Sequence, residues 1–422
     1  MGKVNIDSLR PGNVLAEDLF HSSGRLLLSK GLRLEPTHLR VLKVWGVGSA
    51  EIEGAPDGSR LPASEDIEPA VLKKAEELTR KQFSHVHMDH PFLKELLQIC
   101  TLRRAQQMTL QKTLGSNQGT PGLETVPGAD VKPSPTVGTR KQNLASLPDE
   151  DVWTLSSLPL IFTEINRVVN DPRSSANSVA DVISKDPNLT TKLLKIVNSS
   201  FYGFPSKIDT VSRAVTILGS RELTTLALGT SLLTIFRDIP PDLVDMKSFW
   251  MHSVACGVAA RMIAKYKNVA NTERLFVAGL LHDIGRVIIY KHLPDQGREI
   301  LLHARRTGCL LRSAELEVLG FDHTQVGATL IKKWQFPLVL EQALTYHHQP
   351  TLSQHLLEAS IVHIADILIN ALMIGTSGER FVPPLIPKVW AELGLETEMF
   401  PRSIRLVDRQ VEEIYHLFFE GE

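Results

Sequence analysis

The chain has 422 residues, with 46 Lys and Arg against 47 Asp and Glu, so its formal net charge at pH 7 is -1. This balance excludes a strong long-range attraction to nucleic acid or to an anionic membrane. Hydrophobic residues make up 43% of the chain and charged residues 22%, which excludes disorder along its whole length. A chain of this length is expected to form two or three domains.

The apolar runs of the sequence are short. Residues 275–281 form one of the longest, far below the ~18 to 20 residues that a membrane-spanning helix requires. Residues 1–7 carry charge where a secretory signal has its apolar core. The cysteines, Cys100, Cys256 and Cys309, are odd in number and widely spaced, as in proteins of a reducing compartment. We therefore expect a cytoplasmic protein without a membrane-spanning segment.

Short apolar runs alternate with turn signals at the start of the chain. The runs are residues 4–6, 26–28 and 47–52. Gly24 and Gly31 flank the second run, and such punctuation of short runs is typical of strands. Apolar residues at helical spacing occupy residues 36–45. The sequence predicts a small α/β module over residues 1–60.

The next part of the chain consists of a predicted helical segment followed by a stretch rich in Gly and Pro. Apolar residues recur at helical spacing in residues 61–114, which predicts a helical segment. Residues 115–138 hold five Gly and four Pro, above the roughly 25 to 30% at which a segment stops forming a core. We interpret residues 115–147 as a flexible linker.

The second half of the chain shows helical spacing almost throughout. Asp186 followed by Pro187 has the pattern of an N-cap with proline at the first helical position. Gly219 follows an apolar run and predicts a helix end. We expect a mainly α fold, with a multi-helix bundle over residues 148–370 and C-terminal helices over 371–422 that pack on it.

Histidine is concentrated in one part of this predicted bundle. Nine of the fifteen histidines lie between His252 and His363. The run from Gly279 ends in the adjacent pair His282 and Asp283, and an imidazole followed by a carboxylate can ligate one ion and bridge to a second. The same pair can also serve only to satisfy the end of a helix. Further candidates for a shared cavity lie beside helical apolar patterns, and they are His252, His323, His347, His348 and Asp366.

Several short motifs in a fixed order resemble the HDOD family, a branch of the HD superfamily, over residues 155–366. The motifs that carry the resemblance are Leu155-Ser156-Ser157-Leu158-Pro159, Asp186-Pro187-Asn188-Leu189, Asn198-Ser199-Ser200-Phe201-Tyr202-Gly203, Trp250 to Ser253, Gly279 to Gly285, Glu315 to Gly320, His323 to Gly327 and Tyr346-His347-His348. Residues 6–12, with residues 15–18, are similar to a module often placed ahead of HD-GYP signalling domains.

The resemblance implies an all-helical, HD-like bundle and a regulatory role in bacterial signal transduction through contacts with protein partners. HDOD domains are generally regarded as lacking enzymatic activity. In enzymes of the wider superfamily, the positions that match His252, His282, Asp283 and Asp366 hold divalent metal. Histidines similar to His323, His347 and His348 are added in HD-GYP phosphodiesterases. The resemblance thus implies one or two ions of iron, manganese or zinc.

Two departures from the HD-GYP pattern leave two functions open. Arg286 stands where that pattern has Lys, and Gln349-Pro350-Thr351 stands in place of the GYP segment. A planar guanidinium does not replace a compact ammonium group. The chain is therefore expected to be a regulatory protein. The alternative is a metal-dependent phosphohydrolase with HD-GYP-like chemistry, based on the retained ligand set.

Other features have simpler explanations. His85, His87 and His90 form a local cluster that could be a metal site, but a polar turn before Pro91 explains it as well. The helices on either side of Gly219 resemble a helix-turn-helix, but residues 223–236 contain no Lys or Arg and the net charge is near zero, which argues against a reader of a DNA groove. His303 and His355 match no ligand position and are expected to be histidines packed and hydrogen-bonded in the helical core.

Overall fold

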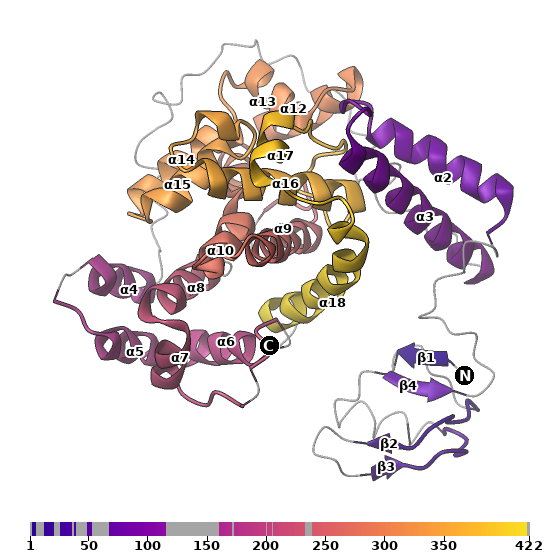
Figure 1. The fold of residues 1–422 in the computed structure, drawn as a ribbon, viewed down its shortest axis with the longest axis horizontal. Coiled ribbons are helices and arrows are strands. Elements are labelled where there is room, and N and C mark those ends of the chain that lie inside the picture. The colour runs from indigo at the N-terminus through magenta and orange to yellow at the C-terminus, as the bar shows by residue number, and fades with distance from the viewer. Residues whose placement is uncertain are drawn as a thin grey trace. The chain divides into compact units, whose positions relative to one another are not determined.

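The computed structural model is mainly helical, and Figure 1 shows its course. The structure describes residues 2–5, 12–20, 26–35, 38, 49–52, 67–114, 160–170, 173–199, 201–204, 206–232 and 239–419. The chain forms two compact units. The N-terminal unit comprises Met1–Glu76 and Thr101–Gln118, and the helical unit comprises Glu77–Cys100 and Gly119–Glu422. The predicted linker, residues 115–147, lies outside the described residues.

The N-terminal unit contains two small antiparallel pairs of strands. Strand β1 (Gly2–Asn5) pairs with β4 (Ser49–Ile52), and β2 (Leu19–Phe20) pairs with β3 (Leu26–Leu28). Their small core consists of Leu15, Leu34, Ala50 and Ile52. The three predicted apolar runs thus overlap strands β1, β3 and β4. The helix predicted over residues 36–45 falls outside the described residues except for His38.

Two helices follow, and the division between the two units falls within both of them. They are α2 (Pro69–Gln82) and α3 (Pro91–Leu114). In the N-terminal unit, Ala75 of α2 and Ala105 of α3 share a buried cluster with Ile67. In the helical unit, Phe92 of α3 stacks on Trp390, with ring centroids 4.5 Å apart.

The helical unit contains most of the elements of the chain. They are α4 (Leu160–Asn170), α5 (Ala176–Ser184), α6 (Pro187–Val197), α7 (Val211–Leu218), α8 (Ser220–Leu232), α9 (Met246–Tyr266), α10 (Thr272–Leu281), α11 (Ile284–His292), α12 (Pro294–Thr307), α13 (Leu311–Val318), α14 (His323–Lys333), α15 (Leu338–Tyr346), the short 3-10 helix η4 (Pro350–Leu352), α16 (Leu356–Leu372), α17 (Pro387–Leu393) and α18 (Met399–Phe419). This multi-helix bundle confirms the predicted fold class.

Local signals in the sequence set several helix ends. The Asp186 carboxylate accepts a hydrogen bond from the Leu189 amide at 2.9 Å, and Pro187 opens α6, as predicted. Gly219 ends α7 at a φ of +93°, a conformation that favours glycine. Helix α8 follows at once and is buried from residue 223 to 232. It is therefore not exposed for contact with a DNA groove.

Helix α9 lies in the middle of the helical unit and packs against α10, α16 and α18 (Figure 1). Two glycines allow α9 and α10 to approach closely. A Cβ atom on Gly257 would lie 2.7 Å from the Phe276 carbonyl oxygen, and one on Gly279 would lie 2.6 Å from that of Cys256. This close approach brings the rings of His252 and His282 to 5.3 Å between centroids.

Helices α11 and α14 meet at a second pair of glycines, Gly285 and Gly327. The space around them predicts how much stability each loses when it is replaced by alanine. A Cβ atom on Gly285 would overlap the carbonyl oxygen of His323, so we expect Gly285→Ala to lower the free energy of unfolding by roughly 1–3 kcal/mol or more. Gly327→Ala is the matched control, because its Cβ atom would meet Ile284 at an ordinary 3.5 Å. Urea denaturation measures both. Equal losses in the two variants would contradict this account.

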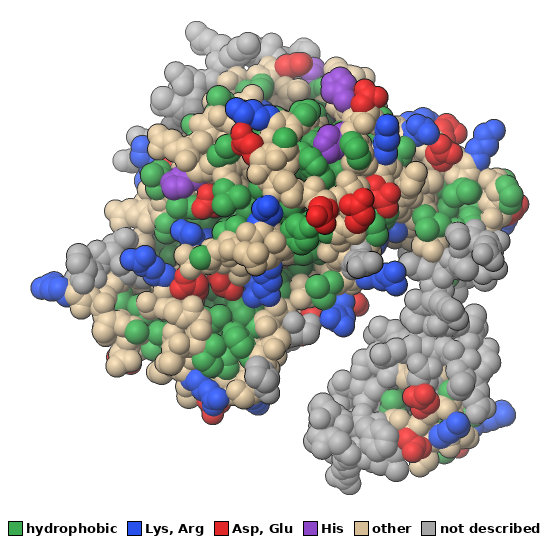
Figure 2. All heavy atoms as spheres, in the orientation of Figure 1, with side chains coloured by type: hydrophobic (Ala, Val, Ile, Leu, Met, Phe, Trp, Pro, Cys, Tyr) green, Lys and Arg blue, Asp and Glu red, His purple; other side chains and the backbone are tan. Residues whose placement is uncertain are grey.

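The surface carries charges of both signs. Figure 2 shows Lys and Arg side chains interspersed with Asp and Glu on the visible face of the helical unit, in keeping with the net charge of -1. The helices that the structure describes include none that is both long enough and apolar enough to cross a membrane.

Candidate metal centre

The seven predicted ligand residues converge in the helical unit from five places in the chain. His252 lies on α9, His282 and Asp283 join α10 to α11, and His323 begins α14. His347 and His348 follow α15, and Asp366 lies in the middle of α16. Six of the seven residues are buried, with exposed fractions of the whole residue between 0% and 4%. His348 alone among the seven is half-buried.

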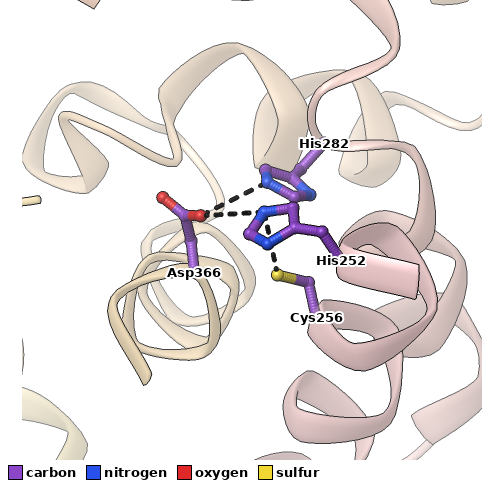
Figure 3. Close-up of side chains that lie close together, drawn as sticks. All are labelled: His252, Cys256, His282 and Asp366. Carbon is purple, nitrogen blue, oxygen red and sulfur yellow. Dashed lines mark hydrogen bonds and ion pairs between the residues drawn. The ribbon is translucent and has the colours of Figure 1, made fainter. Parts of the chain in front are cut away.

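The first group of donors lies between α9, α10 and α16 (Figure 3). The Asp366 Oδ1 atom lies 3.6 Å from His252 Nε2 and 3.4 Å from His282 Nε2. Asn370 donates a hydrogen bond of 2.6 Å to the same oxygen and holds the carboxylate in place. Cys256 also faces this group, with its Sγ atom 3.6 Å from His252 Nε2.

The second group of donors consists of His323, His347 and His348. The Nε2 atoms of His323 and His348 are 3.2 Å apart, and the ligand atoms of all three residues lie within 4.8 Å of one another. Asp283 lies between the two groups. Its Oδ1 atom is 3.2 Å from His323 Nε2, and its Oδ2 atom is 3.3 Å from His282 Nε2. One carboxylate therefore faces both groups.

Hydrogen bonds on the far side of three imidazole rings fix their orientation. The Nδ1 atoms of His282 and His347 each lie 2.7 Å from a backbone carbonyl oxygen one helical turn earlier, at Gly279 and Leu344. A carbonyl oxygen only accepts, so each Nδ1 carries the proton. His323 Nδ1 pairs in the same way with the Glu315 carboxylate at 2.5 Å. The Nε2 atoms therefore face the interior of the centre, where each can ligate a cation once it carries no proton.

Several buried polar atoms at the centre have no hydrogen-bond partner among the described residues. They are His282 Nε2, His347 Nε2 and Asp283 Oδ1. Such orphaned atoms are costly, because burial without a partner forfeits their hydration. All three are good donors to a divalent cation. The residues present are therefore suited to bind a metal ion, because the atoms without a hydrogen-bond partner belong to the two donor groups and to the carboxylate between them.

Arg286 is buried beside the centre and makes contacts on three sides. Its Nη1 atom donates to Asp283 Oδ2 and to Ser377 Oγ, both at 2.7 Å. Its Nε atom donates to Glu315 Oε1 at 2.9 Å. Glu315 in turn holds His323. The guanidinium thus orients both the shared carboxylate and one of the imidazoles.

The charges at the centre do not balance without further positive charge. Asp283, Glu315 and Asp366 carry three negative charges when ionised, and Arg286 carries one positive charge. Burial would raise the pKa of Asp283, but Arg286 and the neighbouring imidazoles hold it well below its usual range. The pKa of Asp366 is also low, because His252 and His282 outweigh its burial. A buried excess of negative charge is stabilised by a bound cation or by protonated histidine.

The negative charge of the carboxylates shifts the pKa of His282 and that of His347 differently. Burial alone would lower the pKa of His282, but the carboxylates of Asp283 and Asp366 raise it to about 10. Burial, together with His282 and His323, lowers the pKa of His347 to about 3. In the absence of metal, a proton on His282 therefore supplies part of the missing positive charge, while His347 stays neutral.

Sequence reasoning missed three residues that contact the predicted set. Cys256 stands four residues after His252, and Asn370 stands four residues after Asp366, so both could have been placed on the same helix faces. Glu315 belongs to a motif that pointed to the family but carried no assigned role. Its contacts to Arg286 and His323 depend on the packing of α11, α13 and α14.

The remaining histidines lie elsewhere. His303 pairs with Glu317 at 2.7 Å near the surface, and both His303 and His355 are only half-buried, so the expectation that they belong to the core was wrong. His363 Nδ1 bonds the His347 carbonyl oxygen, on the outer side of the centre. His85 bonds the Gly308 carbonyl oxygen and contacts Phe381, and His90 contacts Trp390. The rings of His85 and His90 thus contact different neighbours, as expected of a polar turn.

A helical domain that gathers histidines and aspartates from several helices around one HD pair has the architecture of an HD-type domain. Residues 155–350 match the model of the HDOD domain family. The chain therefore carries an HDOD domain, and the family resemblance seen in the sequence is confirmed.

Known proteins resemble this chain at low sequence identity. An uncharacterised protein of Treponema pallidum (strain Nichols) is 25% identical over 216 residues, which cover 50% of this chain and 41% of that protein. The match thus spans less than half the length of this relative. An HDOD domain protein of unknown function from Geobacter sulfurreducens has a solved structure that is 23% identical, covers 61% of this chain and 92% of its own, and has a TM-score of 0.50.

A second solved structure matches most of the chain. It is a protein from Marinobacter aquaeolei VT8, named provisionally as a signal transduction protein, and it is 18% identical with a TM-score of 0.50. The match covers 90% of this chain and 72% of that one. At these identities the likeness shows a shared fold.

Proposed function

We propose that this protein acts in bacterial signal transduction, with an HDOD domain that holds divalent metal and works through contacts with partner proteins, without turning over a substrate. The observation that carries the metal-binding part is the convergence of His252, His282, Asp283 and Asp366, with His323, His347 and His348, on one buried centre. The signalling part is supported by the HDOD domain and by the name of the Marinobacter neighbour.

The two donor groups support a pair of metal positions. His252, His282 and Asp366 would hold one ion, and His323, His347 and His348 the other, with Asp283 between them. Imidazole and carboxylate ligands suit iron, manganese and zinc. Bound there, such ions would supply Lewis acidity and a nucleophile at neutral pH. The residues themselves orient the donor atoms and shield them from solvent.

Two features of the centre support binding without turnover. The Arg286 guanidinium is committed to Asp283, Glu315 and Ser377, so it is not free to bind a substrate phosphate. Access is restricted as well, because six of the seven ligand residues are buried and only His348 is half-buried. A substrate phosphate would have to reach the ions past these side chains.

A hydrolysis assay tests this part of the proposal. The full-length protein, loaded with Mn²⁺, Fe²⁺ or Zn²⁺, is given bis(p-nitrophenyl) phosphate and a cyclic dinucleotide. We expect the same rate as that of Asp283→Asn, because Arg286 is not free to bind the phosphate and burial of the ligand residues restricts access to the ions. Turnover by the wild-type protein that the variant lacks would overturn the proposal and favour a metal-dependent phosphohydrolase. The shared position of Asp283 between two donor groups is the observation that favours this second candidate.

Metal binding is expected to release protons. The pKa of His282 is raised to about 10, so His282 is protonated at pH 7 and must lose that proton to become a ligand. His347, with a pKa of about 3, is already neutral and releases none. Metal affinity should therefore fall as pH falls from 10 towards 7, by on the order of tenfold per pH unit.

Calorimetric titration with Zn²⁺ in two buffers of different ionisation enthalpy measures this release. We expect the ion that His282 binds to release at least one proton at pH 7. His303→Ala, which removes a histidine near the surface, should leave the number unchanged. Zinc binding without proton release would contradict the raised pKa of His282.

A cytoplasmic location and protein partners belong to the same proposal. Its support is the odd number and wide spacing of the three cysteines, Cys100, Cys256 and Cys309, and the net charge of -1, which gives no strong long-range attraction to nucleic acid. Affinity capture from a bacterial lysate, with the Gly285→Ala variant as a control for a disturbed bundle, would identify partners that depend on the intact fold.

A further inference from the structure

Cys256 has no role in the ligand set proposed above, yet it lies inside the centre. It follows His252 by one turn of α9, so both side chains leave the same face of the helix (Figure 3). The side chain is fully buried, with an exposed fraction of 0%. Its Sγ atom lies with the ligand atoms of His252, His282 and Asp366 in a group within 4.8 Å of one another.

Three distances within this group are close to the edges of a tetrahedron around a single ion. Zinc bond lengths of about 2.0–2.1 Å to nitrogen or oxygen and about 2.3 Å to sulfur give edges of about 3.3 Å between N and O and about 3.5 Å between N and S. The observed separations of Asp366 Oδ1 from His282 Nε2 and of Cys256 Sγ from His252 Nε2 are 3.4 Å and 3.6 Å. Asp366 Oδ1 lies 3.6 Å from His252 Nε2.

An independent observation points to a ligand at the same place. His282 is 1% exposed, and its Nε2 atom has no hydrogen-bond partner among the described residues. The Nδ1 atom on the other side of the ring is occupied by the Gly279 carbonyl oxygen. The free nitrogen therefore faces Asp366 and the interior of the group, where a cation would satisfy it.

We infer that Cys256 is a thiolate ligand, which completes a site of two histidines, one cysteine and one aspartate with His252, His282 and Asp366. This inference rests on the proposed metal centre and adds a ligand to it. As the sulfur–metal bond forms, the Cys256 S–H proton passes to solvent, and no electron is transferred. Asp283 remains available to the second position through its Oδ1 atom, which lies 3.2 Å from His323 Nε2.

A thiolate changes which metal the first position prefers. Sulfur ligands favour zinc and other thiophilic ions, whereas manganese and magnesium prefer oxygen. The second group, of His323, His347 and His348, contains no sulfur. The two positions thus have different chemistry, and the first is a zinc or ferrous-iron site that discriminates against manganese.

X-ray absorption spectroscopy of the full-length protein with one equivalent of Zn²⁺ tests the inference directly. We expect one sulfur scatterer at about 2.3 Å from zinc in the wild-type protein. Cys256→Ser, which is nearly isosteric, should show only nitrogen and oxygen, and its preference for Zn²⁺ over Mn²⁺ should fall at least about tenfold. A protein with Cys100 and Cys309 both replaced by Ser is the matched control, and it should keep the sulfur scatterer.

The outcomes separate this inference from the proposed function. Stoichiometric zinc with a shell of nitrogen and oxygen alone in the wild-type protein would overturn the role of Cys256 and leave the metal centre standing. A wild-type protein that binds no divalent metal would overturn both. The wild-type spectrum decides the matter even if the Cys256→Ser protein does not fold.

Discussion

Replacing Asp283 by Asn is expected to reduce the metal content of the purified protein to less than about a tenth of the wild-type value. The carboxylate faces His282 with one oxygen and His323 with the other, so its loss weakens both metal positions at once. Asn has nearly the same shape and keeps one oxygen, but it lacks the negative charge. Elemental analysis by mass spectrometry, after removal of adventitious metal, measures the effect.

A control for this prediction is the same substitution at Asp245. That carboxylate caps α9, the helix that carries His252, through bonds to the amides of Lys247 and Ser248. Asn is an equally good N-cap, so Asp245→Asn should keep the wild-type metal content. Circular dichroism checks that both variants fold. If Asp283→Asn retained the full metal content, Asp283 would not be a ligand.

Replacing Arg286 by Met is expected to lower the free energy of unfolding by about 3–5 kcal/mol. The change leaves the buried carboxylates of Asp283 and Glu315 without their hydrogen-bonded cation, and the hydroxyl of Ser377 without its donor. Burying an unpaired charge is among the most destabilising changes that a single substitution can make. Urea denaturation of the metal-free protein measures it.

Two further variants sharpen this prediction. Arg286→Lys restores the charge but not the planar fork that contacts three groups, so its loss should be smaller than that of the Met variant. Arg298→Met removes a pair with Asp242 near the surface and should cost less than about 1 kcal/mol. Similar losses for the Arg286 and Arg298 variants to Met would contradict a structural role for the buried guanidinium.

Much of the bundle and of the candidate site follows from local patterns. Asp186 with Pro187, and Gly219, mark helix ends in the sequence and do so in the structure, because caps and glycine act within one turn. The HD pair at residues 282 and 283 ends an apolar helical run, and its adjacent imidazole and carboxylate already made both residues candidate ligands. The family motifs then related His252, His323 and Asp366 to this pair.

The contacts that hold the ligand side chains in place could not be predicted from local sequence patterns. Glu315 contacts Arg286 across 29 positions of sequence and His323 across 8, and only the packing of three helices brings them together. The hydrogen bonds that occupy the Arg286 guanidinium were likewise not predictable. The sequence showed that Arg stands where the HD-GYP pattern has Lys, but not which groups the Arg contacts. Cys256 had a local signal in its spacing from His252, but buried cysteines are common in helical cores.

The close contact between Gly285 and His323 links the centre to the way α11 and α14 cross. Asp283 stands two residues before this contact on one side, and His323 forms it on the other. A partner protein whose binding shifted α14 along α11 would therefore separate Asp283 from His323 and lower the affinity of the centre for its ion. By thermodynamic reciprocity, a filled centre resists such sliding to the same degree. Metal binding and partner binding would then each change the affinity of the protein for the other, through the contact between α11 and α14.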